Sequence, residues 1–379
     1  MSEDKYKKAA RAIIKAGTLP FPVNETLLEI LQLLLTEEDL IFIDAFKRKS
    51  SQTMEELKKS STLPEERLHL SIKSLAKKGF LFNQPNSEGI MVYRLMPILM
   101  VGAFEYIFMK KINYTEEEKK IAYLFEDYFH EISDFIQSNY GTITPIFEKM
   151  RPYDRTLSIL DDNIDGEEID IEINSSIEIP EEQIIPTQKV EELINKFDDI
   201  AVGRCFCRQH KDLLGHSCTQ TELRENCFTF GKSARYVTEQ GFGRLVSKQE
   251  ALEIMKKSEA DGLVHKAFHP HSDIHREESS ICNCCKDCCG TLEYWRMGLT
   301  ALINSTNYLS RINEDICTGC GICIHKCPVD AIKLNNNDKA EVNEQYCIGC
   351  GVCAHFCPEH AISLLEGLRT VYLPPPRIK

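Results

Sequence analysis

The amino-acid sequence predicts an α+β fold in three parts, and three observations support that prediction. Capped helical patterns followed by a hairpin pattern occupy residues 22–95. Helix and strand patterns alternate among nine cysteines over residues 187–304. A cysteine-rich motif occurs twice near the C-terminus. The predicted divisions are an N-terminal module at 1–150, an acidic linker at 151–186, a cysteine-rich α/β metal-binding domain at 187–304, and a C-terminal domain at 305–379.

Composition narrows the class of protein. The net charge of −13 argues against nucleic-acid binding by the chain as a whole, because phosphate binding requires a basic surface. The 17 cysteines indicate metal-held thiolates in a reducing compartment, so we expect a cytoplasmic protein. The N-terminus lacks a signal-peptide pattern. The longest apolar stretch, 95–109, is too short to span a bilayer and contains Glu105, so no membrane contact is expected.

The N-terminal pattern is helix, helix, short helix, longer helix and hairpin. Asn24, Thr36 and Thr53 are predicted N-caps, because a side-chain oxygen before an apolar-periodic run satisfies free helix N–H groups. The longer helix runs over 64–78, and strands flank the turn-rich segment 83–89. This order resembles a winged helix, a fold that many transcription regulators use.

The longer helix bears on whether that module binds DNA. It begins with Glu65 and Glu66, which favour the helix dipole but would repel phosphate. Lys73, Lys77 and Lys78 lie further along. We therefore favour a protein-contact module, with DNA binding as the alternative. A further helix is predicted at 115–138, after the hairpin. It carries a wide aromatic stripe that packs within its own domain or, alternatively, forms a homodimer seam.

Nine cysteines in the middle domain form two groups. A strand at 200–203, a helix at 251–260 and a strand at 263–265 are predicted between and around them, and Trp295 with 299–303 predicts a linking helix. Arg204 and Arg208 are expected to lower nearby thiol pKa values. The first group can supply four thiolates and the second four or five. An additional iron–sulfur cluster is favoured over zinc, with free redox thiols as a third alternative. The residues are Cys205, Cys207, Cys218 and Cys227, then Cys282, Cys284, Cys285, Cys288 and Cys289.

The duplicated unit has the spacing C-x2-C-x2-C-x3-C-P in both copies, offset by 30 residues. Zinc sites usually pair two short cysteine turns instead, and glycines between the cysteines let the backbone curl around a cluster. Residues 313–364 resemble the two-cluster bacterial-type ferredoxin domain. That resemblance implies two [4Fe-4S] clusters, the first held by Cys317, Cys320, Cys323 and Cys357, the second by Cys347, Cys350, Cys353 and Cys327.

Taken together, these features predict an iron–sulfur electron-transfer protein. It would relay single electrons through two clusters to a further metal centre or to a partner oxidoreductase. No Ser-His-Asp arrangement, phosphate loop or dinucleotide fingerprint is visible, so the chain is predicted to be a redox component and not a self-contained enzyme. Two alternatives remain: a redox-sensing winged-helix transcription regulator, and a reductase with its active centre at Cys282–Cys289.

Overall fold

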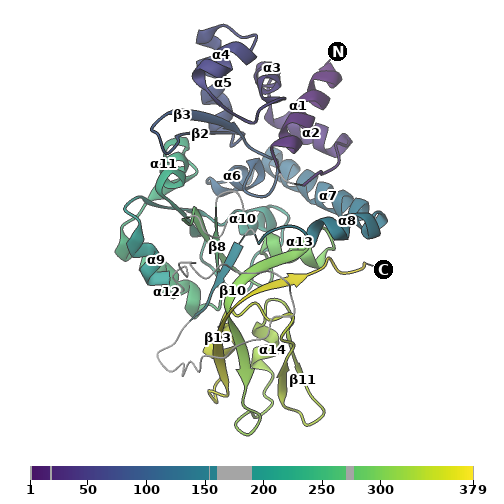
Figure 1. The fold of residues 1–379 in the computed structure, drawn as a ribbon, viewed down its shortest axis with the longest axis vertical. Helices are drawn as coiled ribbons and strands as arrows, with labels where there is room; N and C mark the ends of the chain where they lie inside the picture. Colours follow the sequence, from purple (N-terminus) through teal and green to yellow (C-terminus); the bar gives the residue numbers. More distant parts are fainter. Residues whose placement is uncertain (1, 18, 153, 160–189, 270–276, 379) are drawn as a thin grey trace. The chain divides into compact units, whose positions relative to one another are not determined.

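The structure is a computed structural model that describes residues 2–17, 19–152, 154–159, 190–269 and 277–378 (Figure 1). The chain forms two compact units, each assembled from three segments. The first contains Met1–Phe135, Gly203–Ser217 and Lys232–Leu245, and the second contains Ile136–Val202, Cys218–Gly231 and Val246–Lys379. The chain therefore passes between the units repeatedly. The four consecutive divisions expected from the sequence stay a prediction.

The first unit begins with the predicted helices and hairpin. Asn24, Thr36 and Thr53 each accept a backbone N–H at the start of a helix, which confirms the three caps. The three-stranded antiparallel sheet has the order β1-β3-β2. The elements are α1 (Ser2–Ala16), α2 (Glu25–Leu34), α3 (Glu37–Ile43), η1 (Asp44–Phe46), β1 (Ser51–Thr53), α4 (Met54–Ser60), α5 (Glu65–Lys77), β2 (Leu81–Pro85) and β3 (Met91–Leu95).

An aromatic core follows in the same unit. The predicted long helix is present as α7 (Glu116–Ser138), and its stripe is largely buried within the chain. Phe104 of α6 (Ala103–Met109) packs against Phe125 and Phe129 of α7 with ring centroids 5.0 and 5.2 Å away. His210 of α10 (Phe206–Leu213) joins them, and burial lowers its pKa to about 4. The unit also contains most of α11 (Gly231–Gln240) and β7 (Gly243–Leu245).

The second unit is built on a mixed sheet with the strand order β13-β10-β4-β8-β9-β6-β5. The strands predicted near residues 200 and 264 and the helix at 251–260 are confirmed. The strands are β4 (Asp154–Leu157), β5 (Ile200–Arg204), β6 (Glu225–Phe230), β8 (Val264–Phe268), β9 (Ser280–Cys284), β10 (Leu302–Ile312) and β13 (Ile362–Leu373). The helices are α8 (Tyr140–Phe147), α9 (Val190–Lys196), α12 (Lys248–Ala260) and α13 (Gly290–Arg296).

Strand β4 lies inside the range assigned to the acidic linker. It pairs with β8 and β10 in the interior of the sheet, and all four of its residues are buried. The strand was not predicted from the sequence, because its charged residues do not fit the pattern of a buried strand. The charge of Arg155 is compensated by a buried ion pair with Glu278 at 2.7 Å. Most of the predicted linker, residues 160–186, lies outside the described residues.

The helix predicted at 299–303 is wrong. Helix α13 ends at Arg296, and Gly298 follows in a left-handed conformation with φ of +71°. A glycine in that conformation commonly ends a helix. Strand β10 then begins at Leu302 and pairs with β13 along nearly its whole length.

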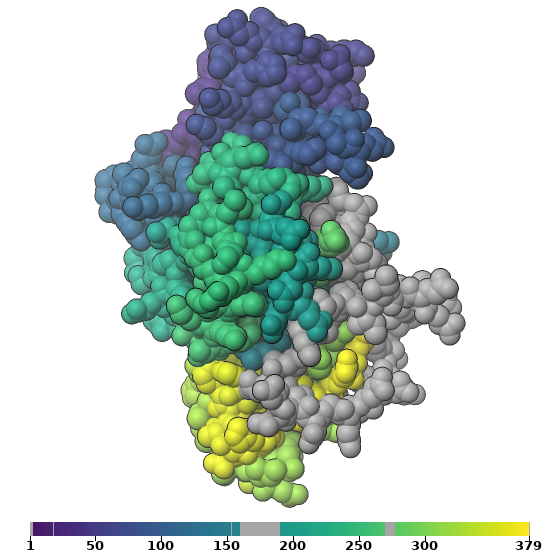
Figure 2. All heavy atoms as spheres, turned by 90° about the vertical axis from the view of Figure 1, so that its left-hand side faces the viewer, coloured from purple at the N-terminus to yellow at the C-terminus, as the bar shows by residue number. Residues whose placement is uncertain are grey.

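The C-terminal repeat is carried between β10 and β13 of the second unit. Each copy places a short helix directly after the second glycine of its loop, Gly321 or Gly351, and a two-stranded sheet joins the copies. Figure 2 shows these residues in light green and yellow, gathered in one region. The added elements are α14 (Ile322–Lys326), β11 (Ile332–Leu334), β12 (Ala340–Val342) and α15 (Val352–His355). Throughout the described ranges, every helix is too short or too polar to cross a bilayer.

Candidate metal centres

Glycines shape the two cysteine loops of the repeat. Gly319 and Gly349 occupy equivalent positions and have φ values of +72° and +63°. A Cβ atom at Gly319 would lie 2.0 Å from the carbonyl oxygen of Asp338, and one at Gly349 would lie 2.1 Å from that of Tyr308. Only glycine combines this conformation with such a close approach of backbone. The loops can therefore curl tightly enough to turn several cysteines inward.

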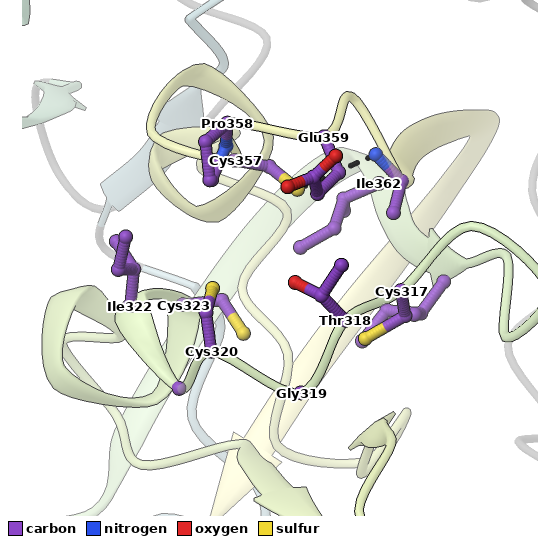
Figure 3. Close-up of a pocket in the computed structure, with 13 residues that line it drawn as sticks. Cys317, Thr318, Gly319, Cys320, Ile322, Cys323, Cys357, Pro358, Glu359 and Ile362 are labelled. Atoms are coloured by element: carbon purple, nitrogen blue, oxygen red, sulfur yellow. Dashed lines mark hydrogen bonds between the residues drawn. The ribbon is translucent and has the colours of Figure 1, made fainter.

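The first loop surrounds a cavity with an empty volume of about 350 Å³. Cys317, Cys320 and Cys323 come from the loop itself, and Cys357 comes from the second copy of the repeat. Figure 3 shows Cys357 on the segment facing the loop, with the four sulfur atoms around the space between them. The structure thus brings together the four residues that the ferredoxin resemblance assigns to one cluster.

The second loop surrounds a matching cavity of about 290 Å³. Cys347, Cys350 and Cys353 line it from the loop, and Cys327 lines it from the first copy. The exchange is reciprocal, since each copy supplies three cysteines to its own cavity and one to the other. This reciprocity ties the two halves of the repeat into one folding unit.

Hydrogen bonds to sulfur repeat with the same 30-residue offset. The backbone N–H of Ala331 donates to Cys327 Sγ at 3.2 Å, and that of Ala361 donates to Cys357 Sγ at 3.3 Å. Ser310 Oγ lies 3.2 Å from Cys353 Sγ. Such donors stabilise negative charge on sulfur ligands and tune metal centres. Sequence reasoning did not find Ser310, because it precedes the motif by seven positions and lies on strand β10.

The surroundings of the cysteines fit bound metal. Burial raises the pKa of Cys353 to about 12 and raises that of Cys350 well above its ordinary value. The pKa values of Cys323 and Cys327 are also raised by burial. Thiolates in such an apolar site require a compensating cation, because desolvation disfavours the charged form. An iron–sulfur cluster supplies that compensation through its iron atoms.

A third group of ligating atoms lies outside the repeat. Sulfur atoms of Cys218, Cys285 and Cys288 and a carboxylate oxygen of Asp287 all lie within 4.8 Å of one another. Hydrogen bonds from the other two thiols lower the pKa of Cys218, and the same interactions raise the pKa of Cys288. Asp287 was not predicted as a ligand, since nothing in its spacing distinguishes it from a surface acid.

The remaining cysteines of the second unit fall into two sets. Cys227 and Cys282 face each other on the paired strands β6 and β9, with sulfur atoms 3.6 Å apart. Cys284 and Cys289 are buried in the apolar core that also contains most cysteines of the repeat. Cys218 was assigned to the first group of cysteines from the sequence. In the structure its sulfur lies close to those of Cys285 and Cys288, which belong to the second group.

Cys205 and Cys207 belong to the first unit, at the start of α10. The pKa of Cys205 is lowered to about 6, mainly by a hydrogen bond from Cys207 and further by the charge of Arg208. The expected effect of Arg208 on a neighbouring thiol is thereby confirmed. The expected effect of Arg204 stays a prediction.

Comparison with known proteins agrees with the geometry of the repeat. The family model of the 4Fe-4S dicluster domain matches residues 310–364. A probable ferredoxin of Methanosarcina thermophila is 48% identical over 29 residues, which are 8% of this chain and 50% of that protein. Protein Pixie of Drosophila melanogaster is 37% identical over 54 residues, 14% of this chain and 9% of its own length.

Both relatives match only a short part of the chain, and the matches span half or less of their own lengths. No solved structure matches the chain. The comparisons therefore concern the C-terminal repeat and leave the larger part of the chain to be interpreted from its own residues. Residues 310–364 form a ferredoxin-type 4Fe-4S dicluster domain within a longer iron–sulfur protein.

Proposed function

We propose that this chain is a redox component that relays single electrons through two [4Fe-4S] clusters to a partner oxidoreductase. The reciprocal exchange of Cys327 and Cys357 between the two cavities is the observation that supports this most directly. The ligands would be Cys317, Cys320, Cys323 and Cys357 for the first cluster, and Cys347, Cys350, Cys353 and Cys327 for the second. Reduced thiolates of this kind suit a cytoplasmic location.

The bound clusters would supply one-electron chemistry, and the chain would set its conditions. Cys320 is exposed, whereas Cys350 is buried. The first cavity thus has the cysteine that is more accessible to an approaching partner. Hydrogen-bond donors such as the N–H groups of Ala331 and Ala361 would stabilise the reduced, more negative clusters. In this arrangement the first cavity would exchange electrons with the partner and the second would sit deeper in the relay.

Iron and sulfide analysis of anaerobically purified protein, combined with EPR, tests this proposal. Two cubanes require about eight iron and about eight sulfide ions per chain, and their interaction should broaden the EPR signal of the fully reduced protein. Protein that contains only zinc in these loops, with no sulfide and no EPR signal after reduction, would contradict the electron-transfer role.

We propose further that the first unit contains a winged helix. Helices α3, α4 and α5 precede the β2–β3 hairpin, and β1 pairs with that hairpin. The favoured use is contact with a protein, because α5 is poor in unpaired positive charge at its start. Glu65 pairs with Lys58 at 2.8 Å, and Arg67 pairs with Glu38. At the other end, Lys78 lies 2.5 Å from Asp39.

The alternative for this module is a redox-sensing transcription regulator. It predicts a sequence-specific DNA complex with a Kd of about 10⁻⁸ M or tighter, sensitive to oxidation of the clusters. We expect no such complex in either redox state, measured by fluorescence anisotropy against a pool of genomic fragments at physiological salt. Reversal of Glu65 and Glu66 to lysine should create weak, salt-sensitive binding, which shows that the assay can detect contact through α5.

A homodimer and a reductase centre at Cys282–Cys289 are further expectations for this chain. The aromatic stripe of α7 is largely buried, but Phe135 is 40% exposed and could contribute to a seam. The chemistry of the Cys282–Cys289 run depends on which metal its cysteines bind.

A further inference from the structure

The group of Cys218, Cys285, Cys288 and Asp287 differs from the ferredoxin cysteines in how closely its ligand atoms approach. Four ligands at about 2.3 Å from one tetrahedral ion stand about 3.8 Å apart. In a cubane each thiolate binds a different iron atom, so the ligand sulfurs stand farther apart. The ligand atoms of this group all lie within 4.8 Å of one another. None of the ferredoxin-type cysteines, all of them described, belongs to such a close group.

The local backbone has the form of a metal-binding turn. Cys285 and Cys288 are separated by two residues, and the N–H of Cys288 donates to Cys285 Sγ at 3.3 Å. This bond folds the Cys-x-x-Cys segment so that both sulfurs face the same side, as structural zinc sites require. Both cysteines are nearly fully buried, at 1% and 3% exposure, and pack against Leu263.

The third sulfur is brought to this turn from a distant part of the second unit. Cys218 precedes Asp287 by 69 residues. The N–H of Thr219 donates to the Asp287 carboxylate at 2.8 Å, and the N–H of Lys286 donates to the Gln220 side chain at 2.9 Å. Gln220 also donates to the carbonyl of Gly262 at 2.8 Å. The Cys218 loop is therefore fixed over the turn by bonds that do not involve its sulfur.

We propose that Cys218, Cys285 and Cys288, with Asp287 as the fourth ligand, bind a single tetrahedral zinc ion. Three sulfurs and one carboxylate oxygen form a donor set that zinc accepts, and the close spacing suits one ion. With four protein ligands the site has no open position, so its role is structural. The ion closes a long loop and so restricts the unfolded chain. This site goes beyond electron transfer, and it places a non-redox metal beside the ferredoxin-type domain.

The test is metal analysis of the full chain, purified anaerobically and compared with a Cys285→Ser/Cys288→Ser variant. We expect about one zinc ion per chain in the natural protein and a loss of at least about tenfold in zinc in the variant. Iron and sulfide should be unchanged, so the result does not depend on whether the proposed electron-transfer function holds. X-ray absorption at the zinc edge should show sulfur and oxygen neighbours in a ratio of three to one.

Two milder variants keep the test decisive if the double variant fails to fold. Asp287→Asn changes an exposed residue and should lower zinc affinity about 10–100-fold, measured by competition with a chromogenic chelator. Cys227→Ser is the matched control, because Cys227 lies outside the group and faces Cys282 instead; it should retain full zinc.

Three results would overturn the assignment. If the double variant loses about four iron and four sulfide ions, this group holds a cluster. If it loses iron without sulfide, the ion is a redox-active iron and not zinc. Natural protein that contains no metal beyond the ferredoxin iron, and whose thiols at this site react freely with an alkylating reagent, would show that the cysteines bind no ion.

Discussion

The ferredoxin-type loops and the Cys285–Cys288 turn, both in the second unit, bring their cysteines together in different ways. The ferredoxin-type loops use left-handed glycines to bend the chain, and their cysteines surround two cavities of about 350 and 290 Å³. The Cys285–Cys288 turn uses one short N–H to sulfur bond and brings its three sulfurs close together, with a single cysteine added from a remote loop. The difference indicates that the spacing of the ligand atoms, and not the number of cysteines, distinguishes the two regions as metal sites.

The largest expected effect comes from breaking the exchange between the two loops. Cys327→Ala should remove the EPR signal of the second cluster, because Cys327 lines the cavity of Cys347, Cys350 and Cys353. Iron should fall to about half of its natural content. Zinc at the Cys285–Cys288 turn should remain, since that site shares no ligand with the loop.

A double-variant comparison identifies which cluster is lost. Adding Cys350→Ala to Cys327→Ala should remove no further iron, because both residues line one cavity. Adding Cys320→Ala instead should remove nearly all iron, because Cys320 lines the other cavity. The reverse pattern would mean that each copy of the repeat holds its own cluster without exchange.

The next effect concerns the glycines that distinguish the loops from the turn. Gly319→Ala should prevent the first loop from closing, because its Cβ would lie 2.0 Å from the Asp338 carbonyl oxygen. Gly321→Ala is the matched control in the same loop, since nothing lies within 4 Å of its added Cβ. The control should cost only about 1–2 kcal/mol for its left-handed conformation.

Iron content and thermal unfolding measure this pair. Gly319→Ala should lose about half of its iron and show a broad, early transition. Gly321→Ala should keep its iron and unfold a few degrees lower than the natural protein. Equal behaviour of the two variants would show that left-handed strain, and not the close approach to Asp338, limits the loop.

These two regions also differ in how far their sequences predict them. The repeat could be predicted closely because four cysteines, two glycines and a proline recur at a fixed offset, and each type has one physical reason to be there. The group at Cys218 could not be predicted, because its members lie 69 residues apart and their meeting depends on how strands β6, β8 and β9 pair. Adjacent cysteines in the Cys282–Cys289 run gave no indication of which sulfurs share a site.

Elements of the fold show the same contrast. Helices with an N-cap and an apolar stripe, such as α2, α7 and α12, are found where the pattern predicts them. Strand β4 was missed because Asp154 and Arg155 are charged, although both are fully buried in the sheet. Burial of charge depends on partners far along the chain, such as Glu278, and periodicity in a short window cannot reveal such partners.

A smaller effect tests how the second cavity is tuned. A metal-bound thiolate cannot donate, so the Ser310 hydroxyl must be the donor to Cys353 Sγ at 3.2 Å when a cluster is present. Ser310→Ala removes a hydrogen bond that stabilises the reduced form. The whole bond contributes about 0.5–1.5 kcal/mol, and the part of it that is specific to the reduced form should shift the potential of the second cluster negative by at most about 20–65 mV.

Protein-film voltammetry measures that shift, and the first cluster provides the internal control. Its potential should stay unchanged, because Ser310 does not line its cavity. A shift of both clusters by the same amount would show that Ser310→Ala alters the domain as a whole and not the sulfur of Cys353.

The smallest expected effect links the two cysteine regions. Lys286 lies within the Cys285–Cys288 turn, and its ammonium is 2.7 Å from the Asp330 carboxylate of the ferredoxin-type domain. Its charge also favours ionisation of Cys327. Lys286→Met removes a positive charge near the second cluster, so the reduced form loses some stabilisation. Because the ion pair is partly exposed, the loss should be about 0.3–0.5 kcal/mol, a negative shift of about 10–20 mV.

This variant separates a structural link from an electrostatic one. The negative shift should shrink as salt is raised from about 0.01 to 1 M, since screening weakens the interaction of partly exposed charges. Zinc content should stay at about one ion per chain, because the N–H of Lys286, which binds Gln220, is retained in methionine. A shift that is insensitive to salt and accompanied by loss of zinc would mean that Lys286 acts by holding the turn in place, and that the two metal regions are coupled through packing instead of charge.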